Sequence, residues 1–346
     1  MAKRVFVGLS GGVDSATSAA LLKEEGYDVV GAFIKIWSPE FIECTWQEDR
    51  LDAMRACAAL GIQFREIDLS EEYKGEVVQT MINDYERGIT PNPDVLCNRS
   101  IKFGHFATWA FQNGADVIAT GHYARIHKEG DRYELLRGSD SNKDQSYFLY
   151  RLGQENLSRI LFPIGGYSKK EVRLLAKRFA LLNAEKPDSQ GLCFVGEVSM
   201  KDFLGRFITL RQGDVIDESG KVIGRHDGAA LYTVGERHGF TSTGSEARYV
   251  VAVDISQNVL KVSSVRADAS RRVVGISDMH WISEPIELPL TAEVQARYRE
   301  KVFQATIKMR GEEITATFDQ PHIAAPGQSL VFYDGDRCLG GGIINN

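Results

Sequence analysis

The stretch that decides the fold of the N-terminal half is Ser10-Gly11-Gly12-Val13-Asp14-Ser15, which directly follows the apolar run Val5-Phe6-Val7-Gly8-Leu9. The run predicts a buried strand, and the helical spacing of apolar residues over 14–25 predicts a helix. Two adjacent glycines permit a tight turn and a close backbone approach, while the N–H groups at a helix start attract anions. The sequence therefore predicts a phosphate-binding loop between the first strand and the first helix.

Other glycine motifs fit this loop less well. No lysine follows the glycines, so it is not a GxxxxGK[ST] loop that would support cleavage between the β and γ phosphates, and GxGxxG is absent. The stretch Gly8-Leu9-Ser10-Gly11-Gly12 also satisfies G-x-S-x-G, which would make Ser10 a hydrolase nucleophile. That hydrolase interpretation and a glycine turn without a ligand remain as alternatives.

Apolar runs and helical periodicity alternate from the first strand to about residue 123. The predicted strands are 5–7, 29–36, 63–68 and 117–119, and the predicted helices are 14–25, 50–60, 72–87 and 101–112. Strand and helix in regular alternation predict an α/β fold with a doubly wound parallel sheet. Such sheets bind ligands at the carboxyl ends of their strands, where we expect Gly8, Ile34 and Thr120-Gly121 to converge.

The regular alternation of predicted strands and helices ends after residue 123. We expect a hairpin around Gly130-Asp131, helices near 155–161, 169–179 and 200–207, and, beyond Gly213, short strands at 250–253, 260–262, 303–309 and 314–318. This pattern divides the chain into an α/β domain over 1–207, a small central β domain over 208–272, and a β-barrel-like domain over 273–346.

Composition excludes several classes of protein. The 346 residues are 43% hydrophobic and 25% charged, which is typical of a folded chain, and the net charge of −6 limits any RNA-binding surface to local basic patches. The chain has neither a signal-peptide core nor an apolar run of about 18 residues, so we expect a cytoplasmic monomer without a membrane segment. The five cysteines are never spaced as CxxC, which argues against a zinc site or a structural disulfide framework.

At the level of motifs, the chain resembles a known family. SGGVDS after an N-terminal strand resembles the PP-loop ATP pyrophosphatases, with their adenine nucleotide alpha hydrolase-like fold, which cleave ATP between the α and β phosphates. Five further stretches resemble the tRNA-specific 2-thiouridylases within that superfamily. They are TPNPDVLCN at 90–98, TGHY at 120–123, SNKDQSYFL at 141–149, DSQGLCF at 188–194 and CLGGGII at 338–344.

The chemistry implied by this resemblance needs two thiols. Adenylation turns a uracil carbonyl oxygen into a leaving group, and sulfur must then arrive in a nucleophilic form such as a cysteine persulfide. Releasing its terminal sulfur requires two electrons, which a second thiol supplies by closing a disulfide. Cys97 and Cys193 follow Pro-rich and Gly-rich segments, where we expect loops with exposed thiolates. Cys44, Cys57 and Cys338 are expected to be inert.

The resemblance also implies roles for individual residues. Cys193 would carry the persulfide, received from a sulfur-relay protein or a cysteine desulfurase, and Cys97 would free the sulfur. Asp94 would be the general acid or base, and His122 would lie beside the target base, which must leave its stack to react. ATP would bind along Gly8, Leu9, Ser10, Gly11, Gly12, Val13, Asp14, Ser15, Ile34 and Gly121. Mg²⁺ would accompany the nucleotide, with Asp14 near the ion, and the protein would hold no resident metal. The tRNA would contact Asn92, Pro93, Asp94, His122, Lys143, Asp144, Gln145, Arg297, Tyr298 and Gln328.

Two basic clusters are candidate RNA surfaces. One comprises Arg297, Arg299, Lys301, Lys308 and Arg310, and the other comprises Lys169, Lys170, Arg173, Lys177 and Arg178, which could equally be a solvated helix face. One departure from the family lies at 232–240, where YTVGERHGF stands in place of the usual YTIGQRKGL. Glu236 and His238 there remove positive charge, which argues against an RNA contact by this segment.

These observations predict an ATP-dependent tRNA uridine 2-sulfurtransferase. By resemblance it would act on the anticodon wobble uridine of the tRNAs for Lys, Glu and Gln. The alternatives are a PP-loop enzyme that adenylates a small metabolite for ligation or amidation, and a tRNA-binding protein with an inactive loop.

Overall fold

The computed structural model describes all residues except 1, 42–45, 188–197, 244–245 and 346. Its N-terminal part is a five-stranded parallel sheet with the order β3-β2-β1-β4-β7. The strands are β1 (Arg4–Leu9), β2 (Asp28–Lys35), β3 (Gln63–Asp68), β4 (Val117–Ala119) and β7 (Ile160–Leu161). The predicted doubly wound α/β sheet is thereby confirmed.

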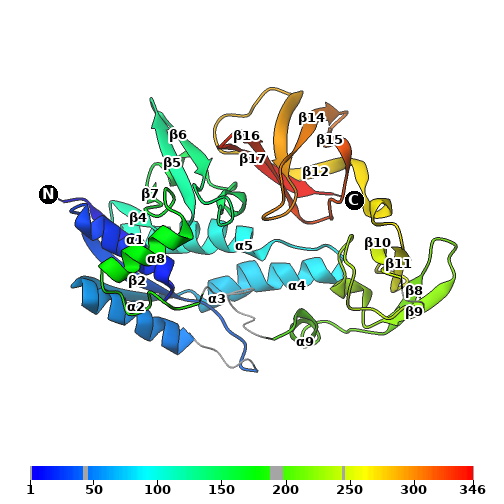
Figure 1. Ribbon diagram of the computed structural model, residues 1–346, viewed down its shortest axis with the longest axis horizontal. Helices are drawn as coiled ribbons and strands as arrows, with labels where there is room; N and C mark the ends of the chain where they lie inside the picture. The colour runs from blue at the N-terminus through cyan, green and yellow to red at the C-terminus, as the bar shows by residue number, and fades with distance from the viewer. Residues whose placement is uncertain (1, 42–45, 188–197, 244–245, 346) are drawn as a thin grey trace.

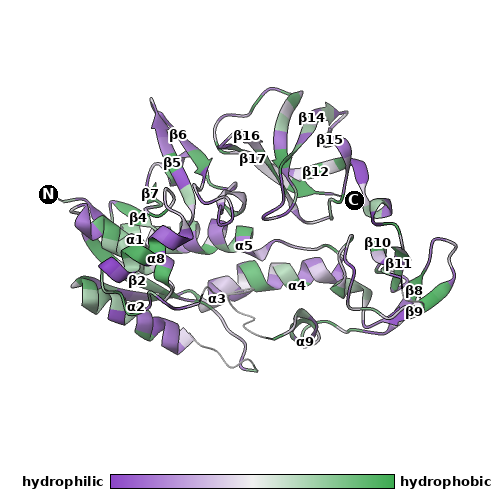
Figure 2. Cartoon of the chain, in the orientation of Figure 1, coloured by the Kyte–Doolittle hydropathy of each residue, from purple (hydrophilic) through white to green (hydrophobic). Residues whose placement is uncertain are grey.

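Helices cover both faces of this sheet (Figure 1). Along β1, Val5 and Val7 pack with α1 (Val13–Glu24), α2 (Trp46–Leu60) and α8 (Lys169–Arg178), whereas Phe6 packs on the opposite face. The helices of that opposite face are α3 (Ser70–Tyr73), η1 (Lys74–Val78), α4 (Gln79–Glu86), α5 (Pro93–Leu96), η2 (Cys97–His105) and α6 (Phe106–Gln112). The inner strands β1, β2 and β4 are buried along most of their length, as is typical of a parallel sheet between two helix layers. The helix α4, on one of these layers, carries both apolar and polar residues (Figure 2).

Three predicted helices differ from the structure in their extent. The helix predicted at 155–161 is only α7 (Gln154–Leu157), because the chain then turns and residues 160–161 pair with β4 as the edge strand β7. The helix predicted at 101–112 begins earlier, at Pro93, where Asn92 caps it. The helix predicted at 200–207 is the shorter α9 (Met200–Leu204).

The rest of the chain forms two β units, as expected. The central sheet has the order β10-β11-β8-β9, with β8 (Gly213–Ile216), β9 (Val222–His226), β10 (Tyr249–Asp254) and β11 (Val259–Ser263). The C-terminal unit is a closed six-stranded antiparallel barrel in which β12 pairs with both β15 and β17. Its strands are β12 (Arg271–Trp281), β13 (Leu290–Gln295), β14 (Phe303–Arg310), β15 (Glu313–His322), β16 (Ser329–Asp334) and β17 (Arg337–Ile344).

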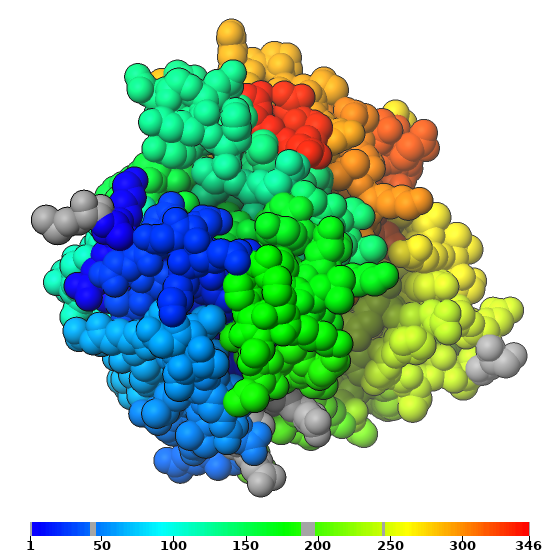
Figure 3. Space-filling model, turned by 60° about the vertical axis from the view of Figure 1, so that its left-hand side comes forward, coloured from blue at the N-terminus to red at the C-terminus, as the bar shows by residue number. Residues whose placement is uncertain are grey.

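The predicted hairpin, β5 (Ala124–Glu129) and β6 (Arg132–Arg137), connects the two ends of the chain. It follows the parallel sheet in sequence, yet β6 pairs with β17 through Leu135 and Leu136. Figure 3 shows the hairpin side by side with the red C-terminal strand. Short helical turns, η3 (Ser146–Phe148), η4 (Ala229–Leu231) and η5 (Arg266–Ala269), complete the connections. The barrel is thus joined to the α/β unit by backbone pairing as well as by side chains.

Candidate active site

The phosphate loop has the geometry of an anion-binding turn. Gly12 is the N-cap of α1 with φ −83° and ψ 164°, and no side chain caps the helix, so its first N–H groups are left open to a ligand. Gly11 has φ 74°, a conformation that favours glycine. The Ser15 hydroxyl accepts a hydrogen bond from the Ser10 N–H at 3.2 Å and donates one to the Gly12 carbonyl at 3.3 Å.

The ends of three strands meet at this loop, as the sequence predicted. A Cβ atom added to Gly8 would lie 3.6 Å from Cδ1 of Ile34 and 3.7 Å from Cγ2 of Thr120. A Cβ atom on Gly121 would lie 2.6 Å from the backbone nitrogen of Ser15, so only glycine allows this approach to the start of α1. The ends of these strands and the start of α1 thus lie together, while the individual ATP contacts stay predictions.

Asp14 has partners that the sequence did not indicate. Its carboxylate accepts hydrogen bonds from the Lys169 ammonium at 2.8 Å to each oxygen and from the Tyr123 hydroxyl at 2.8 Å. The predicted place of Asp14 near Mg²⁺ stays a prediction, and here the Asp14 carboxylate is paired with the Lys169 ammonium. Asn183, also missed, donates from Nδ2 to the Gly11 carbonyl at 3.0 Å. Tyr123, Lys169 and Asn183 lie 109, 155 and 172 positions from their partners in the loop, beyond any local pattern.

The TPNPDVLCN stretch forms the start of a helix. The Asn92 side chain accepts a hydrogen bond from the Val95 N–H at 3.4 Å, and Pro93 occupies the first turn, where its missing N–H costs nothing. Cys97 was predicted in a loop with an exposed thiol, and this was wrong: it lies in the helix and is 7% exposed. Asp94 is one turn before it, and burial raises the pKa of its carboxyl, an effect that the charge of Lys102 partly offsets.

His122 lies under the same helix. Its Nδ1 is 2.7 Å from the Thr120 hydroxyl, and its ring centroid is 5.7 Å from that of Phe103 and 5.8 Å from that of Phe162. Burial, together with the charge of Lys102, holds the pKa of His122 well below its ordinary value. His122 is therefore a neutral imidazole at physiological pH, able to exchange hydrogen bonds but not to carry charge.

The second cysteine of the predicted pair, Cys193, lies outside the described residues with the rest of 188–197, as does Cys44. Within the described part of the chain the cysteines are thiols and no disulfide is present. Burial raises the pKa of Cys57 to about 11 and that of Cys338 to about 12. Both are core residues with protonated thiols, which agrees with the inert role expected of them.

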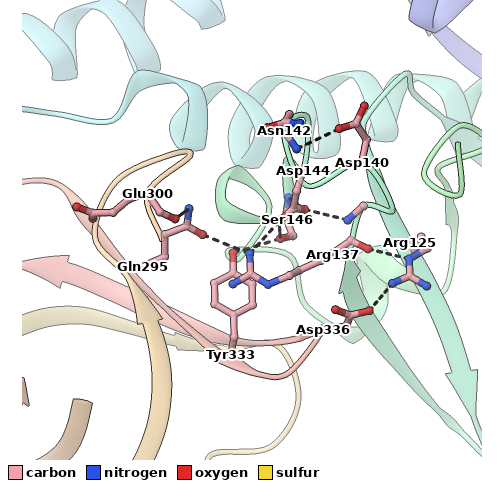
Figure 4. Close-up of polar contacts among 11 residues, drawn as sticks. Arg125, Arg137, Asp140, Asn142, Asp144, Ser146, Gln295, Glu300, Tyr333 and Asp336 are labelled. Atoms are coloured by element: carbon pink, nitrogen blue, oxygen red, sulfur yellow. Dashed lines mark hydrogen bonds and ion pairs between the residues drawn. The ribbon is translucent and has the colours of Figure 1, made fainter. Parts of the chain in front are cut away.

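The KDQ loop is organised around a buried Asp144 (Figure 4). Its Oδ1 accepts the N–H groups of Gly138 at 2.9 Å and Ser146 at 3.0 Å, and its Oδ2 lies 2.9 Å from the Arg137 guanidinium. That guanidinium lies 3.5 Å from the ring centroid of Tyr333 on β16. Asp144 was predicted as a tRNA contact, but its side chain is turned into the junction between hairpin and barrel. Lys143 and Gln145 flank it and are half-buried.

The other predicted tRNA contacts lie where the three units meet. Gln328 donates from Nε2 to the carbonyls of Thr90 at 2.9 Å and Pro91 at 3.0 Å. Arg297 donates to the Val234 carbonyl at 3.0 Å. The Tyr298 ring lies 4.5 Å, between centroids, from Phe148, whose carbonyl accepts from Asn98 next to Cys97. These residues hold the helix that begins at Asn92 against the barrel.

Thr90 connects the α/β unit to both β units. Its N–H donates to the Pro326 carbonyl at 3.1 Å, and its hydroxyl is 2.8 Å from that of Thr233 in the central unit. Thr233 belongs to the segment that departs from the family, and its N–H donates to the Glu236 carboxylate at 3.0 Å. The departing segment therefore contacts the stretch that leads into the helix of Asp94 and Cys97.

The two basic clusters differ in how much charge they expose. In the α8 cluster, Lys169 binds Asp14, Lys177 binds Glu185, Arg178 binds Glu24, and Arg173 donates to two carbonyls. These contacts favour the interpretation that the α8 cluster is a helix face whose cations bind other groups of the protein. In the other cluster, Lys301, Lys308 and Arg310 are exposed. Arg299 donates to the Asn142 carbonyl at 3.1 Å, which places it beside the KDQ loop.

Two general features bear on ligands and location. Within the described ranges, no group of three or more His, Cys, Asp or Glu side chains is arranged to hold a metal ion. None of the described helices combines the length and the apolar character needed to cross a membrane.

Comparison with known proteins places this architecture in context. Residues 3–197 match the family described as tRNA methyl transferase HUP domain, 201–264 the tRNA methyl transferase PRC-barrel domain, and 271–344 the Aminomethyltransferase beta-barrel domain. The tRNA-specific 2-thiouridylase MnmA of Bacillus pumilus is 44% identical over 99% of this chain and 95% of its own length. Proteins of the same name from Bacillus subtilis and Pseudomonas putida are each 43% identical over 99% of this chain, and over 95% and 94% of their own lengths.

Proposed function

The chain belongs to the tRNA-specific 2-thiouridylase family, and from that membership we propose that it is an ATP-dependent tRNA uridine 2-sulfurtransferase acting on the anticodon wobble uridine. The observation that carries the proposal is the identity of 43–44% along nearly the whole chain to enzymes of that name. The geometry supports it, because the open start of α1 follows β1 and His122 follows β4, so both lie at the carboxyl edge of the parallel sheet.

In this proposal ATP is the activating substrate. The phosphate loop at 8–15 binds its phosphates, with Ile34 and Gly121 along the adenosine, and Mg²⁺ enters with the nucleotide rather than on a ligand set of the protein. The uracil O2 bonds to the α phosphorus as pyrophosphate leaves. Asp94 accepts the proton from uracil N3, because a ring that keeps this proton stays neutral and is a poor nucleophile at O2. The raised pKa of Asp94 suits a group that both takes and returns a proton.

Sulfur then enters at C2 as the persulfide of Cys193, and AMP departs. The Cys97 thiolate attacks the Cys193 sulfur, which breaks the persulfide bond, leaves sulfur on C2 as the thiocarbonyl of 2-thiouridine, and forms a Cys97–Cys193 disulfide that an external dithiol reduces.

Partners and setting complete the proposal. The substrates are the tRNAs for Lys, Glu and Gln, which contact Asn92, Pro93, Asp94, His122, Lys143, Asp144, Gln145, Arg297, Tyr298 and Gln328. A sulfur-relay protein or a cysteine desulfurase supplies the persulfide. The protein acts in the cytoplasm as a monomer with domains 1–207, 208–272 and 273–346.

The deciding experiment incubates the protein with unmodified tRNA-Glu transcript, ATP, Mg²⁺ and a persulfide donor, followed by nucleoside mass spectrometry. We expect 2-thiouridine at the wobble position that requires ATP and disappears in Cys193→Ser. If AMP and pyrophosphate form without stimulation by tRNA and no thiouridine appears, the chain adenylates a small metabolite instead.

A further inference from the structure

A short anchor segment, residues 183–186, lies against the phosphate loop. Asn183 is 7% exposed, and its Nδ2 donates to the Gly11 carbonyl at 3.0 Å. This bond fixes the orientation of the amide, because a carbonyl only accepts and the NH₂ group must face it. The other end of the amide, Oδ1, is buried without a hydrogen-bond partner in the described part of the chain. The Asn183 side chain therefore makes one hydrogen bond there, and that bond goes to the loop.

Helices α2 and α8 hold the anchor segment in place. The Lys186 ammonium lies 2.8 Å from the Asp49 carboxylate and 2.7 Å from the Asp52 carboxylate, both on α2. Arg173 on α8 donates to the carbonyls of Ala184 at 2.8 Å and Lys186 at 3.1 Å. Bonds from two helices fix the backbone of this segment, so the side chain at its first position presents its NH₂ group to the loop in one place.

Fixing the Gly11 carbonyl also fixes the direction of the Gly12 N–H. The peptide bond between the two glycines is trans, so its C=O and N–H point in opposite directions. The carbonyl points into the interior, toward Asn183, and the Gly12 N–H therefore points away from it. Gly12 is the N-cap of α1, so this N–H directly precedes the open N–H groups of the helix start. The Asn183 bond thus selects one orientation of a peptide that two glycines would leave free to rotate.

We propose that Asn183 is a positioning residue for ATP, whose amide holds the Gly11 carbonyl so that the Gly12 N–H faces the phosphates. The inference rests on the proposed function, in which this loop binds ATP. A donor that is already oriented costs no reorganisation when the phosphate charge arrives, and it stays in place as charge moves onto the leaving pyrophosphate. In this role Asn183 acts through the Gly11–Gly12 peptide rather than by touching the nucleotide.

The test observes this peptide directly by NMR. Two glycines follow each other only at 11–12, 165–166, 340–341 and 341–342, so protein labelled with glycine carrying ¹³C in the carbonyl and ¹⁵N gives carbonyl–amide correlations for these peptides alone. The Gly11–Gly12 signal reports both the carbonyl that Asn183 binds and the N–H proposed to bind phosphate. In the wild type, ATP with Mg²⁺ should shift this signal, and adenosine, which has no phosphates, should leave it in place. A Gly11–Gly12 signal that ATP does not move overturns the proposal.

Three variants then test the residue itself. Asn183→Leu removes the donor at similar volume and should weaken ATP binding about three- to tenfold, the range expected for one hydrogen bond, while adenosine binds as before. Asn183→Asp keeps the shape without a donor and should weaken ATP binding at least as much. The matched control, Asn113→Leu, loses a similar bond to the Trp109 carbonyl at 2.9 Å on the other face of the sheet, so it should lose stability but no ATP affinity. Wild-type ATP affinity in both Asn183 variants overturns the proposal.

The same measurements separate this inference from the proposed function. If the wild type makes no thiouridine while ATP affinity and the Gly11–Gly12 signal respond to Asn183 as stated, the thiolation assignment fails and the role of Asn183 stands. If Asn183→Leu weakens ATP and adenosine binding by the same factor, the residue supports the fold alone, and the proposal is wrong whatever the activity.

Discussion

The two ends of the proposed site, the phosphate end at 8–15 and the base end around Asp94 and His122, are constructed in different ways. The phosphate end consists mainly of backbone from one stretch, 8–15, with Gly121 packed against it. The base end consists of side chains on the helix that begins at Asn92, and it is held in place by residues far along the chain, such as Gln328, 238 positions from Thr90. The difference predicts that a substitution at the base end changes either the reaction rate or the stability of the fold. A substitution at the phosphate end should change ligand binding and stability together.

The largest effect should come from Asp94→Asn. Loss of the acid or base should lower the thiolation rate by about 10² or more. Stability should change in the opposite direction. Because burial raises the pKa of Asp94 in the folded state, the ionised carboxyl destabilises that state, and stability falls as pH rises through this pKa. The neutral amide of the variant removes that loss, so urea unfolding at pH 8 should show a more stable protein. A variant that is inactive because it is less stable would contradict this.

Asp144→Asn should act on the fold rather than on the chemistry. The Arg137–Asp144 pair is buried, with side chains 20% and 9% exposed, and removing one partner of such a pair typically costs about 3–5 kcal/mol. Urea unfolding should report a loss at the lower end of that range, because the amide oxygen of the variant remains an acceptor for the Gly138 N–H. The control is Lys143→Gln, which should leave the free energy of unfolding unchanged and weaken tRNA binding in a salt-dependent way.

Gly121→Ala tests the phosphate end. The new methyl group would meet the backbone of Asp14 and Ser15 at 2.6–2.8 Å, and neither can move without displacing the start of α1. Overpacking of this kind costs about 1–3 kcal/mol, and ATP affinity should fall with it. Gly166→Ala is the matched control, since nothing lies within 4 Å of its added Cβ. Thermal unfolding would measure the loss of stability, and equilibrium ATP binding would measure the loss of affinity. A loss of stability with unchanged ATP affinity would contradict the expectation that the two change together at the phosphate end.

The features that could be predicted from the sequence differ in the same way between the phosphate end and the base end. The turn between β1 and α1, the parallel sheet and the convergence of Gly8, Ile34 and Thr120 depend on contiguous patterns, and each was predicted correctly. The burial of Cys97 was not, because the helix around it extends to Pro93 and is packed by the barrel. Lys169 and Asn183, which bind the phosphate loop, could not be found either, since their role depends on tertiary contacts across some 155 to 172 positions.

The smallest effect concerns Glu236, in the central segment that departs from the family pattern. Burial raises the pKa of its carboxyl, although His238 and Arg297 act in the other direction, and its charge in turn helps to raise the pKa of Tyr85 on α4 to about 12. The folded state is therefore less stable once Glu236 is ionised, and stability decreases as pH rises through its folded-state pKa. Glu236→Gln keeps an oxygen for the Thr233 N–H, so it should be slightly more stable than the wild type at pH 8 and equal to it at acidic pH, where both side chains are neutral. Urea unfolding at the two pH values measures the difference. A Gln variant less stable at pH 8 would mean that the attraction of the Glu236 carboxylate to the charges of Arg297 and His238 outweighs the cost of its burial, and that charge rather than packing joins this segment to the rest of the protein.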